Sequence, residues 1–566
     1  MSRRLEAVNL KKPTAKVDGN GAGLRSDVDV VLVRPEEHLT NDEAVAALAT
    51  FAAAAADRGD HDAVFQRDGE LVRVLRVSDA EAKNGLSGIK RAAGSARIAP
   101  LPEATLRETL TRAATFQTKV KTDDGAAYKN TSPPVWTVKA VAARARWDGL
   151  PHLTGVVTFP TLRADGSLLQ KPGYDAESGL MHLPTGAVDA VPDAPSRDDA
   201  ARAVNTLLDV LADFPFANAE NEQTTAHHAA AIAAMLTPLA RPAFRDSVSP
   251  LFVVEASVRA TGKTLLVDTI GIILTGEPIA RMRFPGADDP NGEFRKLVTT
   301  VALSGDRICL LDNVTGMLGG ATLDTLLTAP TWTDRLLTTM KQITAPLNAC
   351  WFATSNNASL GGDTARRVLP IRLESPHERP EERDDFRIPD IRKHVREERP
   401  RLLAAALTIL RGYYAAGCPK QAFTPWGSYE DFDRIVRSAV IWAGLPDPCL
   451  TRASLTVSAT TEDDGVRDLV HGLKEMIDSH PMGKVRGSIQ AGEIARALNS
   501  VTDTTNDPYS RIRNGLEALR DDSRGNLDPQ KVGLLLRRYR GRWVDCLQIQ
   551  TGPEVNGSKT WRIAAR

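Results

Sequence analysis

The chain has 566 residues, which is enough for roughly three to four domains at about 150 residues each. Lysine and arginine number 71, and aspartate and glutamate also number 71, so no overall positive charge indicates nucleic-acid binding, which would have to come from local patches. The five cysteines are scattered without a CxxC pair, which argues against a disulfide framework and against a zinc ribbon.

The first 26 residues are polar and contain several glycines, which predicts a disordered lead-in. They lack the apolar core of a signal peptide, and no apolar run in the chain approaches the ~20 residues that span a bilayer. We therefore expect a soluble, cytoplasmic protein without a membrane partner.

Residues 27–190 mix short strand-like and helical patterns, which predicts an N-terminal α+β domain. Helices are expected at Asn41–Ala56 and Pro102–Ala114, and the Asp165-Gly166 turn between two apolar runs indicates a β-hairpin. The proline- and aspartate-rich stretch Val188–Asp199 then predicts a linker into the next domain.

Residues 191–390 show the strand and helix alternation of an α/β nucleotide-binding core. Two predicted helices, Ala200–Ala212 and Gln223–Leu239, lead to an apolar strand that begins at Leu251. This strand runs into a Gly-Lys-Thr turn, and the helix that follows is expected to stop at Gly276, before a proline.

The turn after this strand has the residues of a nucleotide phosphate loop. In such a loop backbone N–H groups and a helix N-terminus meet phosphate oxygens, while lysine neutralises their charge and threonine ligates magnesium. ATP and Mg²⁺ are therefore the expected cofactors, although the usual pattern has glycine where this chain has Ser257. The predicted nucleotide contacts are Ser257, Arg259, Ala260, Thr261, Gly262, Lys263, Thr264 and Leu265.

A second apolar strand, Arg307–Asp312, ends in a carboxylate. An aspartate at the carboxyl end of a buried strand can hold magnesium together with Thr264, and a plain turn cap is the alternative interpretation. The next residue is Asn313, where many ATPases have an acid that polarises the attacking water, and an amide cannot act as a base. Glu255 and Glu293 are the remaining candidates, so the catalytic base stays unassigned.

A third apolar strand ends in two amides, Asn356 and Asn357, which can hold the lytic water beside the γ-phosphate. A turn without a ligand is the alternative. The arginine pair Arg366-Arg367 follows, at the place where ring-forming ATPases carry a residue that reaches a neighbouring subunit's γ-phosphate. Arg367 is slightly preferred over Arg366, and a surface ion pair is the alternative. The predicted catalytic residues are Lys263, Asp312, Asn356, Asn357, Arg366 and Arg367.

Taken in order, these elements resemble the superfamily 3 type of AAA+ helicase found in phage, prophage and plasmid replication proteins, often primase/helicase proteins. The resemblance covers roughly residues 60–390. Further motifs that fit the same group are Phe214-Pro-Phe216, Trp332-Thr-Asp334-Arg335, Pro380–Phe386, Pro160–Gly166 and Gly173-Tyr174-Asp175. The resemblance implies an AAA+-type P-loop ATPase core and a homo-hexameric ring. It also implies ATP-dependent DNA unwinding in replication, with DNA and replication proteins as partners.

The resemblance also implies a β-hairpin between the aspartate strand and the amide strand that carries a basic residue to single-stranded DNA in the ring's pore. The matching interval is Arg335–Pro346. Lys341 lies near its turn and is the candidate DNA contact, whereas Arg335 is assigned a structural role. An ordinary exposed lysine is the alternative for Lys341.

Residues 391–455 are predicted to be helical, and residues 456–566 to form a winged-helix-like DNA-binding domain. The Asp528-Pro529 signal begins a helix that runs to Arg540, and two strand-like segments, Trp543–Gln550 and Lys559–Ile563, follow it. Protein docking is the alternative to DNA binding for this domain. The cations expected on duplex DNA are Lys531, Arg537, Arg538 and Arg540.

The sequence thus predicts a multidomain α/β protein that acts as an ATP-dependent DNA helicase. One rival is an ATP-dependent replication initiator or loader that remodels DNA without processive unwinding. Another, motivated by Ser257 and Asn313, is a DNA-binding protein with a decayed ATPase site. Primase activity is disfavoured, because the paired acids Asp27/Asp29 and Asp60/Asp62 lie in predicted loops without a supporting polymerase domain.

Overall fold

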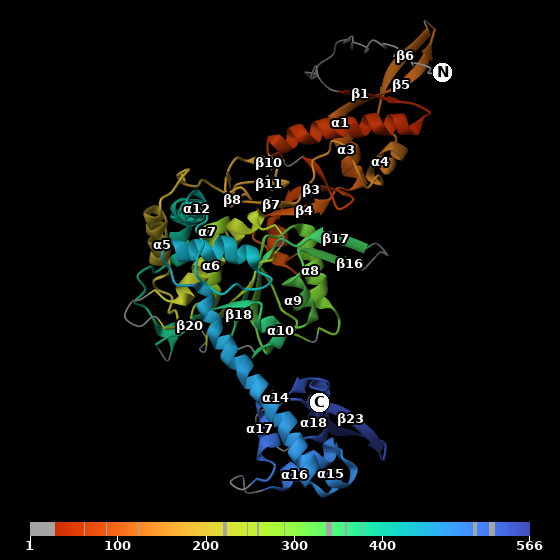
Figure 1. Ribbon diagram of the computed structural model, residues 1–566. Helices are drawn as coiled ribbons and strands as arrows, with labels where there is room; N and C mark the ends of the chain where they lie inside the picture. Colours follow the sequence, from red (N-terminus) through yellow and green to blue (C-terminus); the bar gives the residue numbers. More distant parts are fainter. Residues whose placement is uncertain are drawn as a thin grey trace, which may run out of the picture. The chain divides into compact units, whose positions relative to one another are not determined.

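The computed structural model of the chain (Figure 1) describes residues 29–60, 63–85, 88–123, 125–218, 224–245, 247–256, 260–287, 289–335, 342–356, 359–376, 379–501, 507–519 and 527–565. The predicted lead-in, 1–26, lies outside these ranges. The chain divides into two compact units: one holds the residues up to Val74 and Ala99–Leu153, and the other holds Leu75–Ile98 and Thr154–Arg566.

The first unit packs helices against a small sheet. Its helices are α1 (Glu37–Asp57), α3 (Glu103–Ala113) and α4 (Val135–Ala142). Its sheet has the order β1-β5-β6, formed by β1 (Asp29–Val33), β5 (Ala114–Thr122) and β6 (Gly125–Thr131), and β2 (Val64–Arg67) pairs with β3 (Glu70–Arg76) in a hairpin. The alanine-rich face of α1 packs around buried Trp147, whose Nε1 donates to the Val141 carbonyl at 2.7 Å. The two helices predicted in this region are confirmed within a few residues.

The boundary of this unit differs from the predicted domain 27–190. Residues Leu75–Ile98, which include α2 (Asp79–Asn84) and most of β4 (Ala96–Pro100), belong to the second unit. Lys90 and Arg281 exchange backbone hydrogen bonds of 3.0 Å, and Arg91 donates to both carboxylate oxygens of Asp306 at 2.7 and 2.5 Å. These contacts join residues about 200 positions apart, so no local pattern in the sequence marks them.

Short strands follow in the second unit: β7 (Gly155–Val157), β8 (Thr161–Leu162), β9 (Leu168–Leu169), β10 (Gly173–Asp175) and β11 (Leu180–His182). The predicted Asp165-Gly166 hairpin is confirmed, because β8 and β9 pair antiparallel and Gly166 has the positive φ of 85° that a tight turn requires. Strands β10, β11 and β7 form a separate sheet.

The centre of the second unit is a five-stranded parallel sheet with the order β13-β14-β18-β12-β20. Its strands are β12 (Leu251–Ala256), β13 (Ala280–Met282), β14 (Ile308–Val314), β18 (Cys350–Ser355) and β20 (Val368–Leu373). Because all strands run the same way, their carboxyl ends share one edge of the sheet. The predicted α/β core is confirmed at this level.

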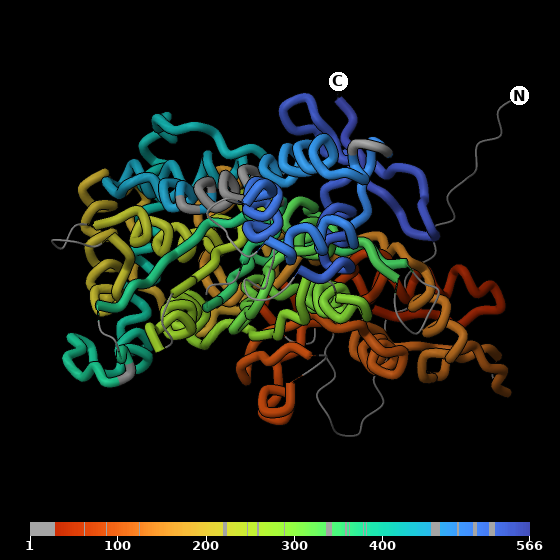
Figure 2. Tube along the Cα trace, turned by 90° about the horizontal axis from the view of Figure 1, so that it is seen from below, coloured from red at the N-terminus to blue at the C-terminus, as the bar shows by residue number. Residues whose placement is uncertain are grey.

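Helices cover both faces of this sheet, as a parallel sheet requires. Alternate residues of β12 point to opposite sides: Phe252 and Val254 join one hydrophobic cluster, and Leu251 and Val253 join another. The flanking helices are α5 (Arg197–Leu211), α6 (Ala226–Ala240), α7 (Lys263–Thr275), α8 (Glu293–Ser304), α9 (Ala321–Leu326) and α10 (Gly362–Ala365). In Figure 2 these yellow-green and green segments lie together. Helix α7 ends at Gly276, with φ of 88°, as predicted.

The predicted helical segment after the sheet is confirmed. It holds α11 (Ile391–Glu397), α12 (Arg399–Ala415), a π-helical turn (Phe432–Arg437) and α13 (Ser438–Trp442). Two shorter strand pairs lie outside this sheet. Strand β15 (Met317–Leu318), which follows β14 in the chain, pairs with β19 (Ser359–Leu360), which follows β18, and β16 (Thr331–Arg335) pairs with β17 (Gln342–Pro346) between β14 and β18.

The C-terminal part has its own hydrophobic cluster. Its elements are α14 (Ala453–Ser479), α15 (Pro481–Arg486), β21 (Ile489–Gln490), α16 (Ala491–Ser500), α17 (Ser510–Ala518), α18 (Pro529–Arg538), β22 (Trp543–Val544), β23 (Leu547–Val555) and β24 (Ser558–Ala565). The predicted Asp528-Pro529 helix start is confirmed, since the Asp528 carboxylate accepts from the Gln530 N–H at 2.9 Å. The second predicted strand, Lys559–Ile563, is confirmed within β24, which pairs antiparallel with β23. The first, Trp543–Gln550, is not a single strand: Asp545 and Cys546, with positive φ angles of 45° and 66°, form a turn that divides it into β22 and the beginning of β23. Among the helices in the described ranges, none combines the length and apolar character needed to cross a membrane.

Candidate active site

The predicted phosphate loop joins β12 to α7 at the carboxyl edge of the sheet. Ala260 and Gly262 have positive φ angles of 60° and 90°, and Gly262 precedes the first residue of α7. A Cβ at Gly262 would lie 3.4 Å from the Phe214 ring, so this position favours glycine both for its φ and for its close approach. The N-cap residue Gly262 has no side chain, and no side chain in the described ranges accepts a hydrogen bond from the first N–H groups of α7, so these remain available to an anion. Ser257 and Arg259 lie outside the described residues.

Lys263 is a buried cation at the start of α7. It is 9% exposed, and burial lowers the pKa of its ammonium group below the usual value. Within the described part of the chain, this ammonium has no hydrogen bond or ion pair. The positive end of the helix dipole adds to the cost of the charge. A buried lysine residue whose ammonium group has no partner in the described residues, at a helix N-terminus, is the arrangement expected of an anion-binding site.

Thr264 and Asp312 meet beside Lys263. The Thr264 hydroxyl donates to Asp312 Oδ1 at 3.2 Å, although the two residues lie 48 positions apart in the chain. The Thr354 hydroxyl, from β18, donates to the same oxygen at 2.7 Å and also accepts the Asn313 N–H at 2.7 Å. Thr354 therefore orients the carboxylate, and sequence reasoning missed it, although it lies only two residues before the predicted amide Asn356.

Asn313 has a backbone role that accounts for an amide at this position. The pairing of β14 with β18 shifts register between Leu311 and Val314, and Asn313 in this bulge has a φ of 53°. Asparagine tolerates the left-handed conformation better than most residues do. The bulge turns Asp312 towards Thr264 and leaves the Asn313 side chain exposed. Asn313, the amide beside Asp312, thus shapes the carboxyl end of β14.

A chain of charges extends from Asp312 into the core. Arg281 Nη1 lies 3.6 Å from Asp312 Oδ2, and Arg281 Nη2 donates to Asp268 Oδ1 at 2.5 Å. Asp268, on α7, is only 1% exposed and also accepts from Arg392 Nη2 at 3.0 Å. The sequence analysis did not identify these charged residues. The only sequence feature that points to them is Asp268, a single acid within an otherwise apolar stretch of α7.

We expect Arg281→Met to lower the free energy of unfolding by about 3 kcal/mol, because it leaves the buried Asp268 carboxylate with a single cationic partner. Chemical denaturation of the purified chain measures this loss. Arg283→Met is the matched control, since Arg283 follows the same strand, is exposed and has no ion pair within the described ranges. The double variant Asp268→Leu/Arg281→Met should recover much of the loss. Equal stability of the wild type and Arg281→Met would contradict the prediction.

Asn356 lies at the carboxyl end of β18, between the ends of β12 and β14. Its side-chain Oδ1 is buried and has no hydrogen-bond partner within the described residues. An unsatisfied buried carbonyl oxygen is costly, so it indicates a place for a polar ligand at this edge. Asn357 lies outside the described residues.

The two predicted arginines have different surroundings. Arg367 forms ion pairs of 2.8 Å with Asp324 and with Asp363. The side chain of Arg366 is exposed and has no ion pair within the described ranges, while its carbonyl accepts from Trp426 Nε1 at 2.9 Å. The geometry therefore favours Arg366 over Arg367 as the arginine free to act on another molecule.

Both arginines lie at the amino edge of the sheet. They precede β20, which runs parallel to β12, and the Leu251 N–H donates to the Arg367 carbonyl at 3.0 Å. Lys263 follows the opposite end of β12, one strand length or about 20 Å away. Neither arginine therefore lies near the predicted phosphate loop of its own sheet.

The two candidate bases are not placed at the Thr264–Asp312 pair. Strand alternation puts Glu255 on the face of Leu251 and Val253, whereas Asp312 shares the face of Leu310. Burial raises the pKa of Glu255 above its usual value. Glu293, at the start of α8, forms an ion pair of 2.7 Å with Lys296. No base is assigned from this geometry.

A cavity of about 340 Å³ adjoins the predicted phosphate loop. It is lined by Phe214, Pro215, Gly262, Leu265, Pro376, Phe386, Ile388, Pro389 and Ile391, among others. The Asp213 carboxylate accepts from the backbone N–H groups of Arg387 and Ile388 at 3.0 and 2.9 Å, and this closes the cavity wall. The cavity thus brings together, beside Gly262, two motifs of the resemblance that are far apart in the chain: Phe214-Pro-Phe216 and Pro380–Phe386.

The predicted hairpin between the aspartate and amide strands is confirmed as β16 and β17. It is anchored to α8, because Trp332 Nε1 donates to the Thr299 hydroxyl at 2.9 Å and Asp334 accepts from the same hydroxyl at 2.6 Å. A groove of about 940 Å³ beside it is lined by Arg295, Lys296 and Arg335 among others. Lys341 lies outside the described residues.

The basic residues of α18 lie on the surface. Arg537, Arg538 and Arg540 are exposed, and so is Lys531. Val532 and Leu536 are buried, while Leu535 is half-buried. The turn between β23 and β24 is Asn556-Gly557, with φ angles of 51° and 72°, which is a common geometry for a tight hairpin.

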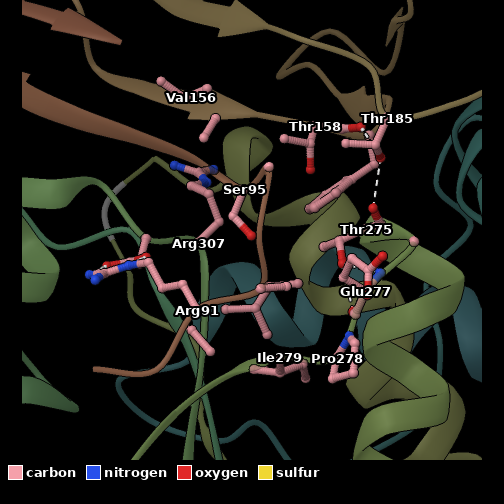
Figure 3. A pocket seen from close by; sticks show the side chains of 18 of the residues that line it. Arg91, Ser95, Val156, Thr158, Thr185, Thr275, Glu277, Pro278, Ile279 and Arg307 are labelled. Atoms are coloured by element: carbon pink, nitrogen blue, oxygen red, sulfur yellow. Dashed lines mark hydrogen bonds and ion pairs between the residues drawn. The ribbon is translucent and has the colours of Figure 1, made fainter. Parts of the chain in front are cut away.

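A second cavity, of about 380 Å³, lies at the amino edge of the sheet, where β13 and β14 begin. Figure 3 shows Arg91, Arg307, Thr158 and Glu277 around it, and Thr185 donating to the Thr275 carbonyl at 2.7 Å. It contains none of the predicted site residues and lies at the opposite edge of the sheet from Lys263.

The acids considered for a primase are not gathered into a site. Asp29 is exposed at the start of β1, and Asp60 lies 3.8 Å from Arg58, while Asp27 and Asp62 fall outside the described residues. Within the part of the chain that the structure describes, no group of three or more histidine, cysteine, aspartate or glutamate side chains could hold a metal ion.

Comparisons with known proteins give distant likenesses only. No family model and no curated protein matches the chain. The A form apo structure of the NrS-1 C terminal region shares 12% sequence identity at a TM-score of 0.31, over 80% of this chain and 94% of that chain. The A form apo structure of NrS-1 CTR(305-718) shares 11% identity at a TM-score of 0.29, over 68% of this chain and 80% of that chain. TM-scores this low carry no argument about function.

Proposed function

We propose that this chain is an ATP-dependent DNA helicase that acts in DNA replication, with an AAA+-type P-loop core and a winged-helix-like DNA-binding domain. The observation that carries the proposal is Lys263, a buried residue at the start of α7 whose ammonium group has no partner in the described residues. A nucleotide triphosphate would supply the missing negative charge. The Thr264–Asp312 pair beside it supports the same assignment.

The residues at this edge suit Mg²⁺ and ATP. A hydroxyl and a carboxylate are hard oxygen donors, and magnesium is commonly held by one or two such groups together with substrate phosphates. Bound there, Mg²⁺ would neutralise charge that develops on the phosphoryl oxygens. Thr354 holds Asp312 in position, and the cavity beside Gly262 suits a nucleobase stacked near Phe214. Asn356 would orient a water molecule through its Oδ1, which has no hydrogen-bond partner in the described residues.

The distance between Arg366 and Lys263 supports a ring. Because these residues flank opposite ends of parallel strands, Arg366 can complete a phosphate site only on a second copy of the chain. In a closed homo-oligomer, which we propose to be a hexamer, each subunit would supply Arg366 to its neighbour. The β16–β17 hairpin would then carry Lys341 towards a DNA strand in the pore.

The test is a forked-duplex unwinding assay run beside an ATPase assay with and without single-stranded DNA. We expect hydrolysis that DNA stimulates, and strand displacement that Asp312→Ala abolishes. Hydrolysis without displacement on forks of either polarity would favour the replication initiator or loader instead. No turnover under any condition would indicate a decayed site.

We expect the exposed arginines of α18 to bind DNA phosphates. The double variant Arg537→Gln/Arg538→Gln should lower the salt slope of duplex binding by about 1.8, at about 0.9 per phosphate contact. Fluorescence anisotropy at several salt concentrations measures the slope. Lys474→Gln is the control, because Lys474 is already paired with Asp478 at 2.8 Å. An unchanged slope would indicate that this domain docks on protein.

A further inference from the structure

The first unit carries a two-stranded ribbon that its core does not need. Strands β5 and β6 pair along their length, and in Figure 1 the ribbon extends away from α1, α3 and α4 of the same unit. Ala114 and Phe116, at the base of β5, are buried in the hydrophobic cluster. From Lys119 onwards β5 contributes no residue to that cluster, and six of the seven residues of β6 are exposed.

One face of the ribbon collects cations, amides and an aromatic ring. The register pairs Lys119 with Tyr128 and Gln117 with Asn130, and residues directly opposite each other share a face. Lys121 lies two residues beyond Lys119 and is therefore on the same face. Gln117 Nε2 donates to Asn130 Oδ1 at 3.1 Å, which holds these two amides in place.

This face carries two exposed cations along β5, and the nearest described acid in the chain is Asp123, just after the strand. Lys119 and Lys121 are exposed, and within the described ranges neither forms an ion pair. No aspartate or glutamate occurs in β5 or β6. Tyr128 is 51% exposed, which is unusual for a large aromatic side chain without a role in a core.

We propose that this face of the β5–β6 ribbon binds single-stranded nucleic acid. The two lysines, about 7 Å apart along the strand, would contact consecutive phosphates, and Tyr128 would stack on an unpaired base. The amides of Gln117 and Asn130 lie on the same face and can hydrogen-bond base edges or sugars. Single strands fit better than a duplex, because stacking on the Tyr128 ring requires a base that is free on one side. The proposal rests on the first unit alone and stands independently of the ATPase.

The first experiment measures binding of a fluorescein-labelled oligo-dT to the full-length, nucleotide-free chain across a range of salt concentrations. Lys119→Gln/Lys121→Gln should lower the salt slope by about 1.4, at about 0.7 per phosphate contact on a single strand. Lys129→Gln is the matched control: it lies on the same ribbon, but it pairs with Thr118 and so faces the other side. The proposal would be overturned if Lys129→Gln lowered the salt slope as much as the double variant does, or if the double variant left the slope unchanged.

The second experiment locates the contact. Ultraviolet cross-linking of a bromodeoxyuridine oligonucleotide should attach it to Tyr128, within the tryptic peptide Thr122–Lys129. Tyr128→Ala should lose this adduct and weaken binding about tenfold, whereas Tyr128→Phe should keep the affinity. An adduct-free peptide would count against the proposal, and so would a ribbon that binds poly-glutamate but not oligo-dT, which would identify an acidic protein as the partner. All substituted residues are exposed, so unaltered melting temperatures verify folding. Gln117, which is half-buried, is left unchanged.

Discussion

Replacing Lys263 with methionine is expected to abolish ATP binding and hydrolysis while leaving the nucleotide-free protein at least as stable as the wild type. Methionine keeps the buried volume and removes an ammonium that has no partner in the described residues. Bound nucleotide at a hundred times its Kd should stabilise the wild type by about 2.7 kcal/mol, and the variant should lose this gain. Thermal melts with and without Mg-ATP, beside an ATPase assay, measure both effects.

The pH dependence of the free energy of unfolding separates the cost of burying the Lys263 charge from any change in packing caused by the methionine. Burial lowers the pKa of Lys263 in the folded state, so the unfolded chain binds this proton more tightly. The wild type should therefore gain stability relative to Lys263→Met as pH rises from the lowered value towards the usual lysine pKa. Lys296→Met is the control, because Lys296 is paired with Glu293 on the surface. An ATP-induced rise in melting temperature that persists in Lys263→Met would refute the assignment.

Replacing Arg366 with alanine is expected to lower kcat for ATP hydrolysis on the order of 10³-fold without preventing nucleotide binding. The reason is the position of Arg366 at the amino edge of the sheet, a strand length from the phosphate loop of its own subunit. Two inactive variants should then complement each other. In a 1:1 mixture of Arg366→Ala and Lys263→Met, about a quarter of the subunit boundaries would combine an intact lysine with an intact arginine.

Arg367→Ala provides the contrast. It removes two ion pairs of 2.8 Å, to Asp324 and Asp363, and should lower stability by about 1 kcal/mol. Its kcat should fall far less than that of Arg366→Ala. Recovery of activity on mixing, measured after subunit exchange, distinguishes the two roles. If the mixture stays inactive while each variant still assembles, Arg366 does not act across a boundary.

The elements that could be predicted from the sequence are those with a strong local signal. The helices α1 and α3, the Gly276 stop of α7 and the Asp528-Pro529 start of α18 depend on spacing and capping within a few residues. That Leu75–Ile98 belongs to the second unit could not be predicted from the sequence. Contacts such as the one between Arg91 and Asp306 join residues that are far apart in the chain.

The candidate site divides in the same way. Lys263, Thr264 and Asp312 could be identified because residue type and neighbouring apolar strands define their chemistry. Thr354, Arg281 and Asp268 could not, since a threonine in a strand and an ion pair across 13 residues carry no motif. The preference between Arg366 and Arg367 also needed the structure, because only the ion pairs of Arg367 separate them.

By itself, the sequence determined the order of an apolar strand, a Gly-Lys-Thr turn, an acid-ended strand and an amide-ended strand. Residue periodicity and turn chemistry are local, so they can be recognised without knowing what packs against them. The tertiary structure alone decided that β18 lies between β12 and β14 and that the Thr264 hydroxyl meets Asp312. It also placed Arg366 at the opposite edge from Lys263. Strand order and register arise from contacts between distant segments, whose energies no single stretch of sequence contains.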